Sequence, residues 1–495
     1  MHLSSRWSTR SSARSASGLV LAVLVLVVYG CGSGPQLKPW HTEALTEEFS
    51  ADMLRDGRVR SFDDYLALEQ RLFKQLDEKI YAKSETGPSH VLERYSTGSL
   101  ADPQHRTPNW NRTFELNRDH AVGGVLLLHG MSDSPYSLRT LALELNRRGY
   151  LVIGLRSPGH GTAPSGLRHV TWRDMAAAVG LAMEHLKSKL GSRPIHVIGY
   201  STGASLALNF SLDVLEGKAV PLPASLILIS PAIRVHPAGA LAGFKNSMAA
   251  LPGLGGLAYL LVMDEFDPYK YNSFATNAGA QVHRLTRQVD RRIRELAQDP
   301  ATVKRLPPIL VLKSTVDATV TTEAVVDNLL MWLPAKRNEL ILFDINRHEA
   351  VKSTLLVSDP APLTDRIMAD KDLPFAVTFI TNESPHSSNV IARRKVSYSL
   401  EKTDTEKLGV AWPWNVVSLS HVALPFSPED PLYGQTVPTD GDMVFLGNLA
   451  IKGERGLLKI PGTWLLRQRH NPFYSYMQAR VLSWLDEANA NTPGR

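Results

Sequence analysis

The stretch PIHVIGYSTG (residues 194–203) decides the fold of this chain. Its last five residues fit the pattern Gly-x-Ser-x-Gly, a short apolar run precedes them, and helix-forming residues follow from Ala204. A strand, a sharp turn and a helix in this order lift the hydroxyl of the central serine, Ser201, above the end of a sheet. We expect glycine at 199 and 203 because a Cβ on either side would clash within so tight a turn.

Apolar runs and helical patterns alternate on both sides of this stretch. Near-continuous apolar strands separated by helices indicate a mostly parallel sheet that is covered on both faces. The sequence therefore predicts an α/β fold. The expected core strands are residues 124–128, 150–155, 195–199, 225–230, 308–312 and 339–343. The other expected elements are helices over 137–148, 172–190 and 282–298, an amphipathic helical region over 41–83, edge strands over 375–380 and 396–400, and a strand over 415–420.

The N-terminus has the features of a secretory signal. Three arginines precede an apolar run, Leu19 to Val28, which is about half as long as a bilayer span. The sequence Val28-Tyr29-Gly30-Cys31 follows and resembles a bacterial lipobox, with the only cysteine of the chain at the site of lipidation. This resemblance implies a lipid anchor on Cys31 and a periplasm-facing protein of the bacterial envelope, with the outer membrane as one candidate. An ordinary signal peptide and an uncleaved anchor are the alternatives.

Composition and missing motifs argue against several functional classes. The 54 basic and 48 acidic residues leave a net charge of +6, and no basic stripe is interleaved with aromatic residues, so nucleic-acid binding is not expected. The sequence has no His-Glu-x-x-His motif and no cysteine cluster, so no metal site is expected. It also has neither a P-loop nor a dinucleotide-binding glycine motif after a strand, and we expect no cofactor.

Two further motifs follow the first core strands. LHGM (128–131) ends the first strand, and GHG (159–161) follows the second. Together with the serine pattern they resemble the α/β-hydrolase superfamily, especially its serine esterase and monoacylglycerol-lipase-like branch. The resemblance implies that the backbone N–H groups of Met131 and Thr202 bind the oxyanion. It also implies that His129 has a structural role.

Ser201 is the nucleophile that the resemblance implies, and it needs a base oriented by a carboxylate. Asp317 follows the strand 308–312, where the acids of the family stand, although a helix N-cap is its alternative role. Two histidines compete for the base. His348 has an ordinary spacing for the family but opens a helical stretch, whereas His421 ends the strand-like run 415–420. We favour His421 because parallel-sheet enzymes keep their chemistry at the carboxyl ends of strands.

The resemblance is strongest over roughly residues 120–350, and the rest of the chain is divided around it. We expect a signal peptide over 1–30, a tether and N-terminal helical extension over 31–112, an α/β-hydrolase catalytic domain over 113–236 and 306–490, and a helical cap insertion over 237–305. The insertion is expected because about 70 residues separate two consecutive core strands, far more than the usual connection.

The function implied is that of a serine hydrolase that cleaves carboxylic esters of lipids or other acyl compounds. A Ser-His-Asp triad would act through an acyl-enzyme. The expected partners are an ester substrate and, through the anchor on Cys31, a membrane. Acyl transfer or amide cleavage on the same fold stays open, as does a catalytically inactive, lipid-anchored binding protein on a hydrolase scaffold.

Overall fold

The computed structural model describes residues 36–234, 255–317, 319–335, 337–350, 356–399, 402–414, 416–437, 443–447 and 468–490. Met1–Lys38 and Pro39–Arg495 are separate compact units, and the second contains the helices and strands described here. The expected signal segment, Cys31 and residues 237–254 of the expected insertion lie outside the described residues. Within the described ranges, no helix is both long enough and apolar enough to cross a membrane.

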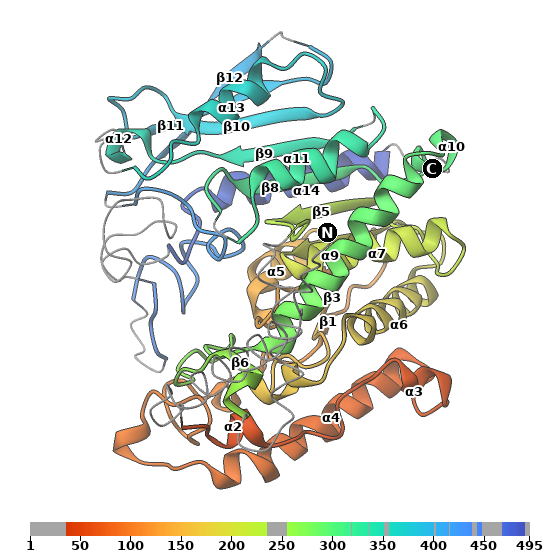
Figure 1. The fold of residues 1–495 in the computed structure, drawn as a ribbon, viewed down its shortest axis with the longest axis vertical. Coiled ribbons are helices and arrows are strands. Elements are labelled where there is room, and N and C mark those ends of the chain that lie inside the picture. Colours follow the sequence, from red (N-terminus) through yellow and green to blue (C-terminus); the bar gives the residue numbers. More distant parts are fainter. Residues whose placement is uncertain are drawn as a thin grey trace, which may run out of the picture. The chain divides into compact units, whose positions relative to one another are not determined.

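A ten-stranded sheet forms the centre of the unit (Figure 1). The strands β3, β2, β4, β5, β8, β9 and β10 lie side by side in this order and pair in parallel. At the edges, β1, β11 and β12 pair antiparallel. The central strands are buried along their whole length because helices cover both faces. The predicted fold class is therefore confirmed. In spatial order the strands are β1 (Phe114–Leu116), β3 (Tyr150–Leu155), β2 (Gly123–Leu128), β4 (Ile195–Tyr200), β5 (Ser225–Ile229), β8 (Ile309–Ser314), β9 (Glu339–Phe343), β10 (Ala376–Asn382), β11 (Asn389–Lys395) and β12 (Lys402–Ala411).

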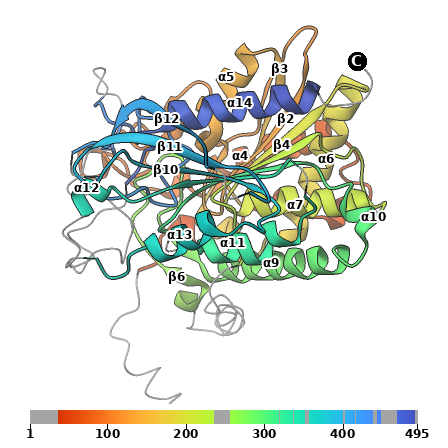
Figure 2. The ribbon, with the colours of Figure 1, turned by 90° about the horizontal axis from the view of Figure 1, so that it is seen from above.

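The helices form a layer on each face of the sheet (Figure 2). α5 (Arg139–Arg147) and α14 (Tyr474–Ala490) lie on one face, where they share a core cluster with the strands. α7 (Thr202–Leu215) packs on the other face, and α6 (Trp172–Leu190) and α9 (Thr276–Leu296) pack against α7. The remaining α-helices and the two strands of a small separate sheet are α2 (Pro39–Thr42), α3 (Asp52–Arg55), α4 (Phe62–Lys79), α10 (Pro300–Val303), α11 (Thr322–Asn328), α12 (Arg347–Ala350), α13 (Ala361–Ala369), β6 (Tyr259–Leu261) and β7 (Phe274–Ala275).

The expected helical region 41–83 contains only one long helix, α4. Its start is set by a capping box, in which the Ser61 side chain accepts from the backbone of Asp64 and the Asp64 side chain accepts from the backbone of Ser61. Gly57 has a φ of +76°, which turns the chain between α3 and α4. The apolar spacing therefore predicts the buried face of α4 correctly. The turn at Gly57 and the capping box at Ser61 separate α4 from the residues before it.

Two strand predictions beyond residue 390 were wrong. Residues 396–399 lie in the turn between β11 and β12, where Tyr398 has a φ of +51°, and residue 400 lies outside the described part of the chain. Within the described residues, the segment 416–420 has isolated bridge residues at Val416 and Ser418, of which Ser418 pairs with Ile345, and residue 415 lies outside the described part of the chain. Its backbone carbonyls accept instead from Asn346, through the main-chain N–H and the side-chain amide. One main-chain and one side-chain hydrogen bond thus stand in place of the ladder that a strand would form.

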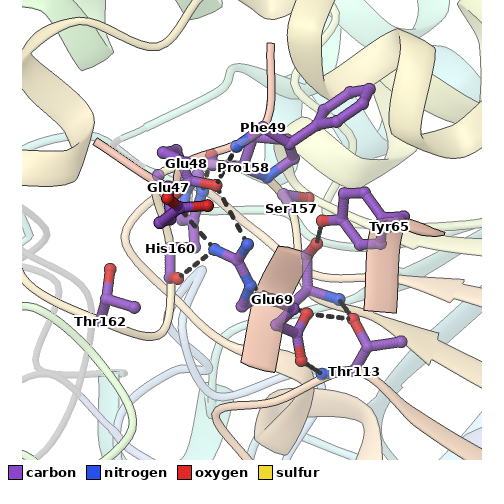
Figure 3. A network of polar contacts seen from close by, with 12 residues as sticks. Glu47, Glu48, Phe49, Tyr65, Glu69, Thr113, Ser157, Pro158, His160 and Thr162 are labelled. Atoms are coloured by element: carbon purple, nitrogen blue, oxygen red, sulfur yellow. Dashed lines mark hydrogen bonds and ion pairs between the residues drawn. The ribbon is translucent and has the colours of Figure 1, made fainter. Parts of the chain in front are cut away.

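A buried network around Arg156 ties the N-terminal region to the end of β3 (Figure 3). The Arg156 guanidinium donates to Glu69 Oε2 (3.0 Å), to both carboxylate oxygens of Glu48 (3.0 and 3.2 Å) and to the carbonyl of His160 (2.9 Å). Glu69 also accepts from the backbone N–H and the hydroxyl of Thr113. A buried guanidinium requires counter-charges, and Glu48 and Glu69 supply them. The N-terminal region that carries these two residues is therefore packed against the end of β3.

Candidate active site

Ser201 occupies the sharp turn between β4 and α7. Its φ of +53° and ψ of −114° lie outside the ordinary regions for a residue with a side chain, a strained conformation of the kind that clusters at functional sites. A Cβ on Gly199 would lie 2.5 Å from backbone atoms of Ala204, and one on Gly203 would collide with the carbonyl oxygen of Leu128. The requirement for both glycines is thereby confirmed, since these contacts are with backbone that cannot move aside.

The imidazole of His421 lies between Ser201 and Asp317. Its Nε2 is 3.0 Å from Ser201 Oγ, and its Nδ1 is 2.8 Å from Asp317 Oδ2. All three residues are buried. Beside a carboxylate, Nδ1 carries the proton and donates it, so Nε2 is left to accept the serine hydroxyl proton. The arrangement can therefore activate an alcohol nucleophile.

The Asp317 carboxylate is held by donors on both oxygens. Oδ1 accepts from the backbone N–H groups of Thr319 and Val320, at 2.8 and 3.0 Å. Oδ2 accepts from His421 and from Lys313 Nζ, which is 2.8 Å away. Burial raises the pKa of Asp317, but the positive charges of His421 and Lys313 outweigh this effect and hold the pKa well below its usual range. The carboxylate thus stays ionised at neutral pH.

The loop after β2 presents the Met131 N–H through a chain of hydrogen bonds. Ser157 N–H donates to His129 Nε2 (3.0 Å), so the ring proton is on Nδ1, which donates to the carbonyl of Gly130 (2.9 Å). Asp133 N–H donates to the same carbonyl at 3.2 Å. Because the peptide bond is planar and trans, fixing the Gly130 carbonyl points the Met131 N–H in the opposite direction.

Burial keeps His129 in the neutral form that this chain of hydrogen bonds needs. It lowers the pKa of His129 to about 4, so the ring has one N–H and one acceptor nitrogen at neutral pH. His129 therefore orients a peptide group, and both of its ring nitrogens are engaged, by Gly130 and by Ser157. Thr202 is the first residue of α7, and its N–H has no acceptor within the helix. A helix N-terminus also favours negative charge.

The segment before α9, within the expected insertion, supports the same loop. Lys270 Nζ lies 2.9 Å from Asp133 Oδ1, and Tyr271 N–H donates to the carbonyl of Ser132 at 2.8 Å. The hydroxyl of Tyr271 donates to the carbonyl of Gly159 (3.2 Å) and accepts from Thr162 N–H (2.9 Å). These contacts join the insertion to both loops that flank Ser201.

The structure thus brings together Ser201, His421 and Asp317. It places the alternative histidine, His348, in the short helix α12 with an exposed side chain. No role for Lys313 is predicted from the sequence. A lysine in an otherwise apolar strand, four residues before the proposed acid, is nevertheless a feature that could have pointed to it. Among the described residues, no group of three His, Cys, Asp or Glu side chains could hold a metal ion.

The mostly parallel sheet, with helices on both faces and a strained serine between β4 and α7, has the arrangement of the α/β-hydrolase fold. More narrowly, residues 119–352 match the Hydrolase_4 family model, which is described as serine aminopeptidase, S33.

Two curated proteins are similar to part of the chain. A thermostable monoacylglycerol lipase of Bacillus sp. (strain H-257) is 38% identical over 85 residues, which are 17% of this chain and 33% of the lipase. A magnesium-chelatase 30 kDa subunit of Rhodobacter capsulatus is 35% identical over 103 residues, or 21% of this chain and 34% of that protein. The chain spans about a third of the length of each relative.

Solved structures are similar at lower identity. One, from work on the metagenome-derived lipolytic enzymes LipS and LipT, is 21% identical, covers 47% of this chain and 87% of its own, and has a TM-score of 0.37. A soluble variant of monoglyceride lipase from Saccharomyces cerevisiae is 17% identical, covers 47% of this chain and 81% of its own, and has a TM-score of 0.36.

Proposed function

We propose that this chain is a serine hydrolase that cleaves carboxylic esters. The observation that carries the proposal is the imidazole of His421, with Nδ1 2.8 Å from Asp317 Oδ2 and Nε2 3.0 Å from Ser201 Oγ. In the proposed reaction, Ser201 Oγ attacks the ester carbonyl while His421 Nε2 takes its proton. The same proton then passes to the leaving alcohol, and water releases the acid from the acyl-enzyme.

The proposed oxyanion donors are the N–H groups of Met131 and Thr202. The Gly130 carbonyl accepts two hydrogen bonds on its other side, which supports an N–H fixed in advance of substrate binding. Donors placed before the reaction stabilise the tetrahedral intermediate without reorganising. Asp317, ionised and held by four donors, would stabilise the imidazolium that forms on His421.

Lipid or other long acyl esters are the proposed substrate class. Leu260, Leu261 and Met263, in the expected insertion, have 48%, 49% and 41% of their surface exposed. Such a run of apolar side chains suits contact with an acyl chain or a lipid surface. The similar Bacillus protein is described as a monoacylglycerol lipase, which is consistent with this class.

Fluorophosphonate labelling tests the proposed function directly. We expect the wild-type protein to form one covalent adduct, since the reagent needs an activated serine, and Ser201→Ala to form none. Ser211→Ala, which changes a serine further along α7 whose hydroxyl donates to the Ala207 carbonyl, is the matched control and should label normally. Intact-mass spectrometry measures the adduct. An unlabelled, folded wild-type protein would favour the inactive binding scaffold.

We further propose that the protein is anchored to the bacterial envelope through a lipid on Cys31 and faces the periplasm. The lipobox-like sequence Val28-Tyr29-Gly30-Cys31 supports this proposal. Cys31→Ser should move the protein from the membrane fraction to the soluble fraction, because one thioether-linked lipid anchor is lost. Ser33→Ala serves as the control, and fractionation with immunoblotting measures both. Unchanged membrane retention of Cys31→Ser would contradict lipidation.

A further inference from the structure

Lys313 is a buried charge that takes no part in the proton transfers of the proposed reaction. It lies on β8, in the run Ile309–Ser314, and its side chain has no exposed surface. Its Nζ donates to Asp317 Oδ2 at 2.8 Å and to the carbonyl of Val320 at 2.6 Å. Burying an ammonium is costly, and an apolar residue would satisfy the strand equally well. The cost of burying Lys313 therefore indicates a role beyond packing.

The position of Lys313 couples it to the proposed base. Asp317 Oδ2, which accepts from Lys313, is also the oxygen that accepts from His421 Nδ1. Each nitrogen lies 2.8 Å from that oxygen, so the ammonium and the imidazole are at most twice this distance apart. At such a separation, two positive charges in a protein interior repel each other. The ammonium thus opposes a positive charge on the imidazole while it holds the carboxylate.

We propose that Lys313 is a positioning residue, which fixes Asp317 Oδ2 against His421 and disfavours the protonated imidazole in the resting protein. The catalytic readout of this proposal rests on the proposed function, but the contact geometry does not. The second contact, to the Val320 carbonyl, fixes the loop whose Thr319 and Val320 N–H groups donate to Asp317 Oδ1, so both carboxylate oxygens are held. Among the described residues, the titratable groups beside the imidazole include Asp317, Lys313 and Tyr200, whose ring lies 5.6 Å from it.

The test compares Lys313→Met with wild type. Methionine fills the stem but removes the charge and both hydrogen bonds. We expect kcat for a p-nitrophenyl ester to fall about 10-fold with KM little changed, because the carboxylate loses one of its supports. We also expect the acid limb of the kcat/KM profile to move up by about one pH unit or more, because the imidazolium is no longer opposed.

Two further variants separate the effect of the Lys313 charge from effects on folding. Lys313→Gln keeps an amide donor, so it should move the acid limb as Lys313→Met does with a smaller loss of kcat. It also provides the measurement if the methionine variant does not fold. Lys395→Met is the matched control, since Lys395 on β11 is equally buried and donates to the carbonyls of Ile367 and Asp370 at the end of α13. A profile of Lys313→Gln that superimposes on wild type would overturn the proposal.

A measurement that needs no substrate distinguishes a failure of this proposal from a failure of the proposed function. In histidine-labelled protein, NMR titration should show the His421 ring protonating at higher pH in Lys313→Gln than in wild type. If the wild-type protein neither hydrolyses esters nor reacts with fluorophosphonate, the proposed function fails while this shift still supports the coupling. If the protein is active but neither the NMR titration nor the acid limb moves, Lys313 is purely structural and the proposal is wrong.

Discussion

Replacing His421 by alanine should lower kcat/KM for ester hydrolysis by a factor on the order of 10⁶, while His348→Ala retains nearly full activity. The size follows from losses seen when the histidine of a serine triad is removed. His421 Nε2 is the atom within hydrogen-bond distance of Ser201 Oγ, at 3.0 Å, whereas His348 is exposed on α12. Steady-state kinetics with a short p-nitrophenyl ester measures both variants.

The two histidine variants also control for each other. Both remove an imidazole, so a general loss of solubility or fold would affect them alike, and circular dichroism at matched concentration checks this. If His348→Ala is inactive and His421→Ala is not, the base has been assigned to the wrong residue. If both are fully active, the hydrolysis does not use a histidine of either position.

Removing one carboxylate from the Arg156 network should cost about 3–5 kcal/mol of unfolding free energy, which is the range for breaking a buried ion pair. In Glu69→Ala, the Nε of Arg156 and the N–H and hydroxyl of Thr113 all lose their acceptor. Unpaired buried donors are penalised in full because water cannot replace the acceptor. Urea-induced unfolding measures the change.

Glu47→Ala is the matched control for this prediction. Glu47 pairs with Arg71, and both side chains are partly exposed, so an effect below about 1 kcal/mol is expected. A similar small loss for Glu69→Ala would mean that water or Glu48 compensates the guanidinium. The network would then contribute little to stability.

The parts of the site that arise from local chain geometry could be predicted from the sequence. The turn around Ser201 needs glycine on both sides, and the strand before Asp317 is a continuous apolar run, so both follow from neighbouring residues. The position of His421 does not follow from its neighbours in the sequence. It was favoured as the end of a strand over 415–420, yet this segment is held by Asn346 and by the Ser314 hydroxyl, which donates to the Leu419 carbonyl.

Long-range polar contacts explain the other omissions. Lys313 is merely an irregular residue in a strand until the fold shows that it and His421 donate to the same oxygen of Asp317. Glu48 and Glu69 have the pattern of solvent-facing charges in an amphipathic region, and only the tertiary fold brings Arg156 between them. Periodicity indicates which face of an element is buried, but it carries no information on which distant charge will meet that face.

The Arg156 network and the segment carrying His421 set the smallest fragment worth expressing. The family match begins at residue 119 and ends at residue 352. A fragment trimmed to those limits would keep Ser201 and Asp317 but would leave out the proposed base and both carboxylates that neutralise Arg156. Family boundaries drawn from sequence similarity would therefore give a fragment without a working site, and truncation series should begin before Glu48 and extend through α14.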